Sequence, residues 1–350
     1  MANDPYDAVL ILSFGGPEKP DDVIPFLENV LRGRNVPRER MLEVAEHYNQ
    51  FGGKSPINDQ NRGLLKALSA ELKEHGIDLP LYWGNRNWHP LLTDVMRQMQ
   101  ADGVQNVLVF VTSIFSSYSG CRQYREDIQR AQAELSLEGM TFHKIRTFYN
   151  HPAFIETMVD RVREALAELP PPAAGSTTDT ADPLLLYTAH SIPSEMAQNC
   201  AYEKQLLESS RLISEAVGIA NWRLVYQSRS GPPQQPWLEP DVCDVLREVA
   251  AQNQARQVVL VPVGFVSDHM EVIYDLDDEA ASLAKDLGLP LARAKTPGVH
   301  PTFVGMIRQL IEERLGRTAE KLAIGRFGPS HDICPADCCR YEPRRPAAGP

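Results

Sequence analysis

The segment 258–279 carries the densest group of side chains that could do chemistry. Residues 258–263 form a β-branched apolar run typical of a strand buried on both faces, and Gly264 then permits a sharp turn of the backbone. Three polar residues follow the strand end at once: Asp268, His269 and Glu271. An imidazole beside carboxylates at this position suits proton abstraction or the handling of a divalent cation.

The carboxylates continue into a segment with helical spacing. Glu271, Asp275, Asp278 and Glu279 fall largely on one side of the expected helix. A solvated acidic first turn, favoured by the helix dipole, is the alternative explanation for these acids. That alternative gives no reason for the Asp-His-x-Glu cluster directly at the strand exit.

The composition is that of an ordinary globular protein. The chain has 350 residues, of which 43% are hydrophobic and 23% charged, and this length allows one large or two medium α/β domains. A net charge of −11 argues against a nucleic-acid-binding protein, which needs a basic surface. The chain starts without a basic signal-peptide region, and no apolar run approaches the length of a membrane span. We therefore expect a cytoplasmic protein without a transmembrane segment, for which peripheral contact with a membrane stays open.

Strand-like and helix-like segments alternate along the chain. Apolar runs at 7–14, 79–84, 107–112 and 141–146 are separated by helical patterns, and so are those at 184–188, 222–227 and 258–263. This alternation with short connections predicts right-handed βαβ units and parallel sheets. A polar stretch rich in Pro, Ala and Thr separates two halves with a similar alternation of predicted strands and helices. We expect an N-terminal domain at 1–168, a linker at 169–183, a C-terminal domain at 184–316 and a tail at 317–350.

Six short segments resemble the signature segments of the ferrochelatases, enzymes that insert ferrous iron into a porphyrin in haem synthesis. Three lie in the C-terminal half: AHSIP at 189–193, QSRSGP at 227–232 with PWL at 236–238, and GFVSDHME at 264–271. Three lie in the N-terminal half: FGGP at 14–17, Tyr48 with GGKSPI at 52–57, and GNRNWHP at 84–90. The similarity runs from residue 6 to residue 315 and is greatest to the actinobacterial-type branch.

The resemblance implies a fold and a metal site. The fold is α/β, with two Rossmann-like (chelatase-type) domains, parallel sheets flanked by helices, and a porphyrin cleft between the domains. His190 and Glu271 would face each other across the cleft, where a neutral imidazole beside a carboxylate can accept the two pyrrole protons. Asp268 would orient His190 or His269, and Asp275 would begin an acidic path for hydrated cations. The residues implied at the metal, with Fe²⁺ as substrate, are His190, Glu271, Asp268 and Asp275.

The same resemblance implies contacts with the porphyrin. Phe14, Ile57 and Trp237 would touch the face of the macrocycle. Propionate or wall contacts would come from four polar residues: Tyr48, Ser55, Arg86 and Ser228. Arginine is the best bidentate partner for a propionate among these. A purely structural role remains the alternative for each of them.

Three of the six cysteines lie in the tail, as Cys334, Cys338 and Cys339. An iron–sulfur cluster or a structural zinc ion takes four such ligands, so the tail is one short. Cys121 resembles the position from which some ferrochelatases supply the remaining ligand of a [2Fe-2S] cluster. The resemblance therefore implies this cofactor, with zinc and free thiols as alternatives. Cys200 and Cys243 lie in helical patterns and are expected to pack in the interior.

Two porphyrins compete as substrate. Coproporphyrin III has more propionates than protoporphyrin IX, so a basic loop with Arg32, Arg34, Arg38 and Arg40 favours coproporphyrin III. The branch resemblance points the same way. We predict a ferrochelatase, a lyase of haem biosynthesis. The alternatives are a cobalt or nickel chelatase of the same fold and a non-catalytic porphyrin or haem carrier, which would not need the acidic residues at 271–279.

Overall fold

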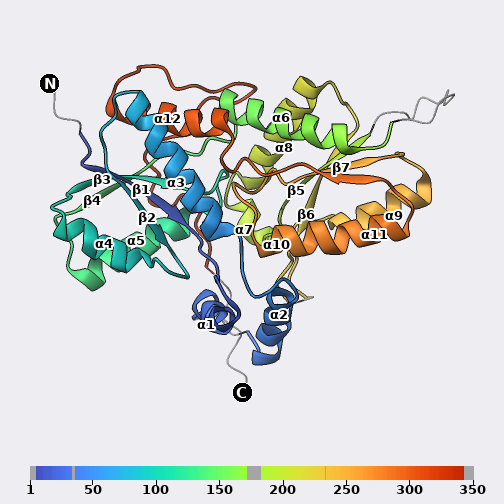
Figure 1. The fold of residues 1–350 in the computed structure, drawn as a ribbon, viewed down its shortest axis with the longest axis horizontal. Coiled ribbons are helices and arrows are strands. Elements are labelled where there is room, and N and C mark those ends of the chain that lie inside the picture. The colour runs from blue at the N-terminus through green and yellow to red at the C-terminus, as the bar shows by residue number, and fades with distance from the viewer. Residues whose placement is uncertain (1–4, 34–35, 172–182, 233, 343–350) are drawn as a thin grey trace.

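The structure is a computed structural model that describes residues 5–33, 36–171, 183–232 and 234–342. This part of the chain contains two parallel four-stranded sheets (Figure 1). The first comprises β1 (Ala8–Ser13), β2 (Leu81–Asn85), β3 (Asn106–Val111) and β4 (Thr141–Lys144), and the second comprises β5 (Leu184–His190), β6 (Trp222–Gln227), β7 (Val258–Val261) and β8 (Leu291–Arg293). The orders β2-β1-β3-β4 and β6-β5-β7-β8 repeat one topology. The predicted α/β fold with two parallel sheets is confirmed.

Helices lie on both faces of each sheet (Figure 1). The first half contains α1 (Pro20–Leu31), α2 (Arg38–Gln50), α3 (Ile57–Glu74), α4 (Leu92–Ala101), the π-helix η1 (Tyr118–Arg122), α5 (Gln123–Leu135) and α6 (Pro152–Glu168). The second half contains α7 (Ser194–Gln198), α8 (Tyr202–Val217), α9 (Val242–Gln252), α10 (Met270–Val272), the π-helix η2 (Ile273–Ala280), α11 (Ala281–Asp286) and α12 (Pro301–Leu315). Among these described helices, none is long and apolar enough to cross a bilayer.

The two halves share one main hydrophobic core. All residues of β1 and β7 are buried, as expected for strands covered on both faces. The core includes Phe110 of β3, Tyr187 of β5 and Phe303 of α12. The last helix, α12, packs against α3 and α6 of the first half. The division into domains therefore stays a prediction, and most of the expected linker lies outside the described residues.

Helices α1 and α2 form a small unit that projects from the sheets (Figure 1). They pack on each other through a hydrophobic cluster of their own, centred on Phe26 of α1 and Met41 of α2. The expected basic loop is wrong in part, because α2 begins at Arg38 and includes Arg40. Arg32 lies in a turn after α1, and Arg34 is outside the described residues.

The tail folds back against the first half of the chain. The Arg146 guanidinium makes two hydrogen bonds of 2.8 Å to the Glu313 carboxylate and a third to the carbonyl of Leu322. The amide of Asn150 donates to the carbonyl of Phe327 at 2.7 Å. These contacts direct the following residues toward η1.

Candidate active site

His190 is the last residue of β5 and lies at the carboxyl edge of the second sheet. The chain leaves the neighbouring strand β7 through Gly264, whose amide donates to the carbonyl of Thr188 at 3.0 Å. A Cβ at Gly264 would lie 2.8 Å from the Cα and Cβ of Ala189, which is too close for any side chain. Glycine is therefore required, and it brings the segment after β7 against the end of β5.

His190 and Glu271 face each other at this edge. The Nε2 atom of His190 lies 3.5 Å from Oε1 of Glu271, and Nδ1 of His269 lies 3.8 Å from Oε2. The Nδ1 atom of His190 makes a short hydrogen bond with the carbonyl of Ser191, and the Tyr202 hydroxyl donates to the carbonyl of His190 at 3.0 Å. The Ser191 bond orients the ring and the Tyr202 bond fixes the backbone at His190, so that Nε2 is the nitrogen presented to a metal or a proton.

The Glu271 carboxylate determines the protonation state of His190. Burial lowers the His190 pKa, but the attraction and hydrogen bond to Glu271, the Ser191 carbonyl and the charge of Asp275 together outweigh it and raise the pKa to about 9. Burial would raise the Glu271 pKa, but the His190 cation outweighs it and lowers the pKa to about 2. Burial lowers the pKa of His269. The raised pKa favours the imidazolium form of His190 in the free protein, whereas the sequence analysis expected a neutral imidazole.

Asp275 lies on η2 beside the His190–Glu271 pair. The Gln227 amide donates to the backbone carbonyl of Glu271 at 2.9 Å and to Oδ2 of Asp275 at 3.2 Å. The hydroxyl of Ser228 donates to the same Oδ2 atom. Burial raises the pKa of Asp275 to about 7, aided by the negative charge of Glu271 and opposed by the Ser228 hydrogen bond. Asp275 can therefore gain or lose a proton near neutral pH.

Asp268 lies close to the pair but is engaged elsewhere. Its Oδ1 atom accepts hydrogen bonds from Arg293 at 3.1 Å and Thr296 at 3.2 Å, and Oδ2 accepts one from Gln60 at 3.4 Å. Within the described chain it makes no hydrogen bond to His190 or His269, so the expected orienting contact is not found. A role at the metal stays a prediction.

Two helices of the first half reach the same region. The Gln60 side chain of α3 accepts a hydrogen bond of 2.9 Å from the backbone amide of Asp268. The ring of His47 on α2 stacks on Tyr274 of η2, with ring centroids 3.9 Å apart. Burial raises the pKa of Tyr48, and the nearby Glu271 charge raises it further. The metal-site segment therefore faces α2 and α3.

Four cysteines, Cys121 of η1 and three of the tail, come from two distant segments of the chain. Cys334 and Cys339 donate toward the Cys121 sulfur, which lowers the pKa of the Cys121 thiol and raises the pKa of both partners. The sulfur atoms of Cys338 and Cys339 are 3.6 Å apart. All six cysteines are free thiols. Among the described residues, the donor atoms that all lie within 4.8 Å of one another are those of His331, Cys334 and Cys338, so ligation by all four expected cysteines stays a prediction.

Two arginines next to Cys121 fix the tail loop. Arg122 donates to the carbonyls of Ala336 at 2.9 Å and Cys338 at 3.1 Å, and Arg125 donates to that of Pro335 at 3.3 Å. Cys339 has a φ of 54°, a left-handed conformation that is unfavourable for a side-chain-bearing residue. A convergent set of soft sulfur donors fits an iron–sulfur cluster or a zinc ion.

Comparison with known proteins agrees with this geometry. The family model described as ferrochelatase matches residues 6–315. The chain belongs to the ferrochelatase family. Ferrochelatases insert ferrous iron into a porphyrin in haem synthesis, so the predicted family, enzyme class and substrates are confirmed. The carrier and the cobalt or nickel chelatase are set aside by a match of this length.

Relatives of the ferrochelatase family cover the chain almost completely. A ferrochelatase from Rhodopirellula baltica is 57% identical over 98% of this chain and 95% of its own length. A coproporphyrin III ferrochelatase from Streptomyces coelicolor is 51% identical over 98% of this chain and 96% of its own. Among solved structures, SirB from Bacillus subtilis with Fe³⁺ has a TM-score of 0.56 at 10% identity, covering 89% of this chain and 96% of that chain. This last likeness supports the fold alone.

The residues expected at the macrocycle face differ in exposure. Phe14 is 38% exposed and packs edge-on against Phe26, which also contacts Tyr48. Ile57 is buried at the start of α3. Trp237 lies so close to Gly231 that a Cβ there would be 2.2 Å from the indole nitrogen, a buried atom without a hydrogen-bond partner in the described chain. Phe14 is the most accessible of the expected set, and porphyrin contact by all three stays a prediction.

The expected polar wall residues have protein partners. Arg86 is almost buried, forms an ion pair with Asp127, and lies over the ring of Tyr124 at 4.7 Å. Ser55 is buried, with its amide donating to the carbonyl of Pro17 at 2.9 Å. Ser228 binds Asp275, as described above. Their propionate contacts stay predictions, and Arg86 would have to share its guanidinium with Asp127.

The structure adds three residues that the sequence analysis did not single out. Tyr202 donates a hydrogen bond to the backbone carbonyl of His190, and Gln227 donates one to the carboxylate of Asp275. Gln227 stands in one of the family-like segments, but nothing in the sequence marks Tyr202. His331 lies beside the tail cysteines, and its spacing of three residues from Cys334 is a metal-ligand spacing that could have identified it.

Proposed function

We propose that this chain inserts ferrous iron into coproporphyrin III at the His190–Glu271 pair. The observation that carries the proposal is this pair, 3.5 Å apart at the carboxyl edge of a parallel sheet. The 51% identity to a coproporphyrin III ferrochelatase supports the choice of porphyrin. We further propose that the ring binds between Phe14 and this edge, with Ile57, Trp237 and Tyr48 nearby.

The pair acts as metal site and proton acceptor in this proposal. Its single proton lies on His190 in the free protein, because Glu271 raises the His190 pKa. As a ferrous ion approaches, the proton of His190 passes to Asp275 and from there to solvent, so that Nε2 becomes free to accept a pyrrole proton. Both pyrrole N–H bonds break, their protons pass to protein bases, and Fe²⁺ forms bonds to the ring nitrogens without electron transfer. Glu271, which lies against His190, is the second base.

Asp275 carries protons away from the pair and guides cations toward it. Its pKa of about 7 lets it exchange protons with solvent at neutral pH. Glu279 lies one turn further along the same helix, and burial raises its pKa. Carboxylates bind a hydrated ferrous ion weakly enough to pass it on. Asp268 would support this path through its hydrogen bonds with Arg293 and Gln60.

The exposed arginines at the α1–α2 unit favour a highly anionic porphyrin. Arg32, Arg38 and Arg40 are exposed, and the Arg40 ion pair with Glu43 is weak because both side chains are in water. Their charge is complementary to the propionates of coproporphyrin III.

Steady-state insertion rates with both porphyrins test this choice. We expect a higher kcat/KM for coproporphyrin III than for protoporphyrin IX. The double variant Arg38→Ala/Arg40→Ala should have a lower kcat/KM for coproporphyrin III, mainly because KM rises. Arg97→Ala on α4 is the matched control and should keep the wild-type kcat/KM. Equal use of both porphyrins, or faster insertion into protoporphyrin IX, would contradict the proposal.

We also propose that Cys121, Cys334, Cys338 and Cys339 hold a [2Fe-2S] cluster. Support comes from the convergence of their thiols and from the lowered pKa of Cys121, since thiolates are the ligating form. When bound, the cluster supplies one-electron redox chemistry, and its ligands join the tail to η1. The four thiols also fit zinc, so metal analysis must accompany the test.

Anaerobic reconstitution with ferrous iron and sulfide tests the cluster proposal. We expect about two irons and two sulfides per chain, with visible charge-transfer absorption. Cys121→Ser should lose this absorption, whereas Cys243→Ser in α9 should retain it. A purified protein that holds one zinc ion and takes up no sulfide would refute the proposal. A site of four reduced thiols also supports the proposed cytoplasmic location, where thiols stay reduced.

A further inference from the structure

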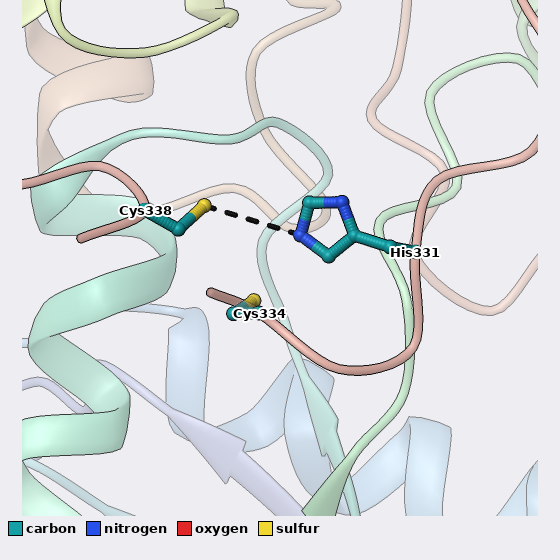
Figure 2. A group of neighbouring side chains, drawn as sticks. All are labelled: His331, Cys334 and Cys338. Atoms are coloured by element: carbon teal, nitrogen blue, oxygen red, sulfur yellow. Dashed lines mark hydrogen bonds between the residues drawn. The ribbon is translucent and has the colours of Figure 1, made fainter. Parts of the chain in front are cut away.

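The imidazole of His331 lies beside the cysteine group and has no role in the functions above. Its Nε2 atom is 3.9 Å from the sulfur of Cys338. The donor atoms of His331, Cys334 and Cys338 all lie within 4.8 Å of one another (Figure 2). The site therefore offers five donor atoms, one more than a [2Fe-2S] cluster needs.

Both neighbours of His331 in the chain are anchored to other elements. The Ser330 hydroxyl accepts a hydrogen bond of 2.7 Å from Thr147. The Asp332 carboxylate forms an ion pair with Lys321 and lies 3.8 Å from Arg314 of α12. These anchors on either side fix the backbone at His331, so its place beside Cys338 is set by the fold.

The four sulfurs are unequally shielded, and His331 stands on the open side. Cys121 and Cys339 are each 5% exposed, whereas Cys334 and Cys338 are half-buried. A cavity of about 370 Å³ opens beside Cys338 and is lined also by His331, Cys200 and Gln205. Figure 2 shows the His331 ring directed at Cys338 from across the tail loop. His331 is thus a polar group that borders one of the two less shielded ligands.

A thiolate that binds iron can only accept hydrogen bonds. The nitrogen of His331 that faces Cys338 must therefore present its N–H to the sulfur. Such a bond withdraws negative charge from the ligand and stabilises the reduced cluster. We propose that His331 donates a hydrogen bond from Nε2 to the Cys338 thiolate and so raises the reduction potential of the cluster. This inference rests on the proposed cluster.

A redox titration of the reconstituted full-length protein tests the inference. His331→Ala should lower the midpoint potential, and His331→Gln, which keeps an N–H donor of similar reach, should restore most of the difference. His75→Ala, at the end of α3, is the matched control and should titrate as the wild type does. A resonance Raman shift of the iron–sulfur bands in D₂O should be weaker in His331→Ala, because one N–H···S bond is lost.

The outcomes separate this inference from the cluster proposal. A wild type that takes up no cluster would overturn both. A wild type with a cluster and a His331→Ala variant of unchanged potential would overturn the role of His331 alone. If the alanine variant does not assemble, the glutamine variant decides: a potential near that of the wild type supports the hydrogen bond, and a lower one with an unchanged D₂O shift refutes it.

Discussion

Replacing Glu271 by glutamine removes the carboxylate that keeps the proton on His190. The His190 pKa is raised from its ordinary value of 6.5 to about 9 mainly by this carboxylate, against the opposing effect of burial. Without the charge, burial dominates and the pKa must fall. The variant keeps the size and polarity of the side chain, so the change isolates the electrostatic effect.

The size of the fall follows from the exposure of the pair. The rise from 6.5 to about 9 corresponds to about 3 kcal/mol of preference for the charged ring. The Glu271 side chain is 48% exposed, so solvent screens the interaction and reduces it to about 1 kcal/mol. We therefore expect the His190 pKa to fall by at least about one pH unit in Glu271→Gln.

An NMR titration of the histidine side chains measures this directly. The chain has nine histidines, and comparison with His190→Ala assigns the signal of interest. Asp278→Asn is the control: it also removes one negative charge, at a residue of η2, and should leave the His190 pKa nearly unchanged. A His190 pKa in Glu271→Gln that equals or exceeds the wild-type value would refute the reasoning about the pair.

Three further changes test other parts of the site. Asp275→Asn should reduce kcat about 10²-fold at neutral pH. Wild-type kcat should rise with pH through about 7, because Asp275 loses its proton there. If this rise persists in Asp275→Asn, proton transfer through Asp275 is contradicted. Glu313→Gln leaves the buried Arg146 unpaired and should lower the free energy of unfolding in urea by about 3–5 kcal/mol, whereas a loss below about 1 kcal/mol would show that the pair is not desolvated. Tyr202→Phe removes one hydrogen bond of about 1 kcal/mol from the backbone of His190. It should lower kcat several-fold with an unchanged circular dichroism spectrum, and wild-type kcat would argue against positioning by Tyr202.

The sheets and the catalytic pair could be predicted from the sequence. The apolar run that precedes His190 and the β-branched run that precedes Gly264 identified strands β5 and β7. Carboxyl ends of neighbouring parallel strands lie at one edge, which explains why His190 and Glu271 meet. The segments that resemble ferrochelatase signatures then predicted the reaction, insertion of ferrous iron into a porphyrin.

The remaining details depend on contacts between residues far apart in the chain. The ion pair of Arg86 with Asp127 joins a loop after β2 to α5, and no local sequence pattern predicts this ion pair. The charge state of His190 depends on the distance to Glu271 and on burial, neither of which a sequence gives. Arg38 and Arg40 were expected in a loop because their segment is rich in Arg, Gly and Pro, yet residues from Arg38 onward pack through Met41 onto α1.

Anaerobic insertion of ferrous iron into coproporphyrin III by wild type and His190→Ala tests the central claim most directly. The decrease of the free-base porphyrin spectrum reports the reaction, and His300→Ala at the start of α12 is the control. We predict that the wild type and the control insert iron and that His190→Ala is slower by at least about 10²-fold. Insertion by His190→Ala at the wild-type rate would contradict the assignment of His190 to the metal site.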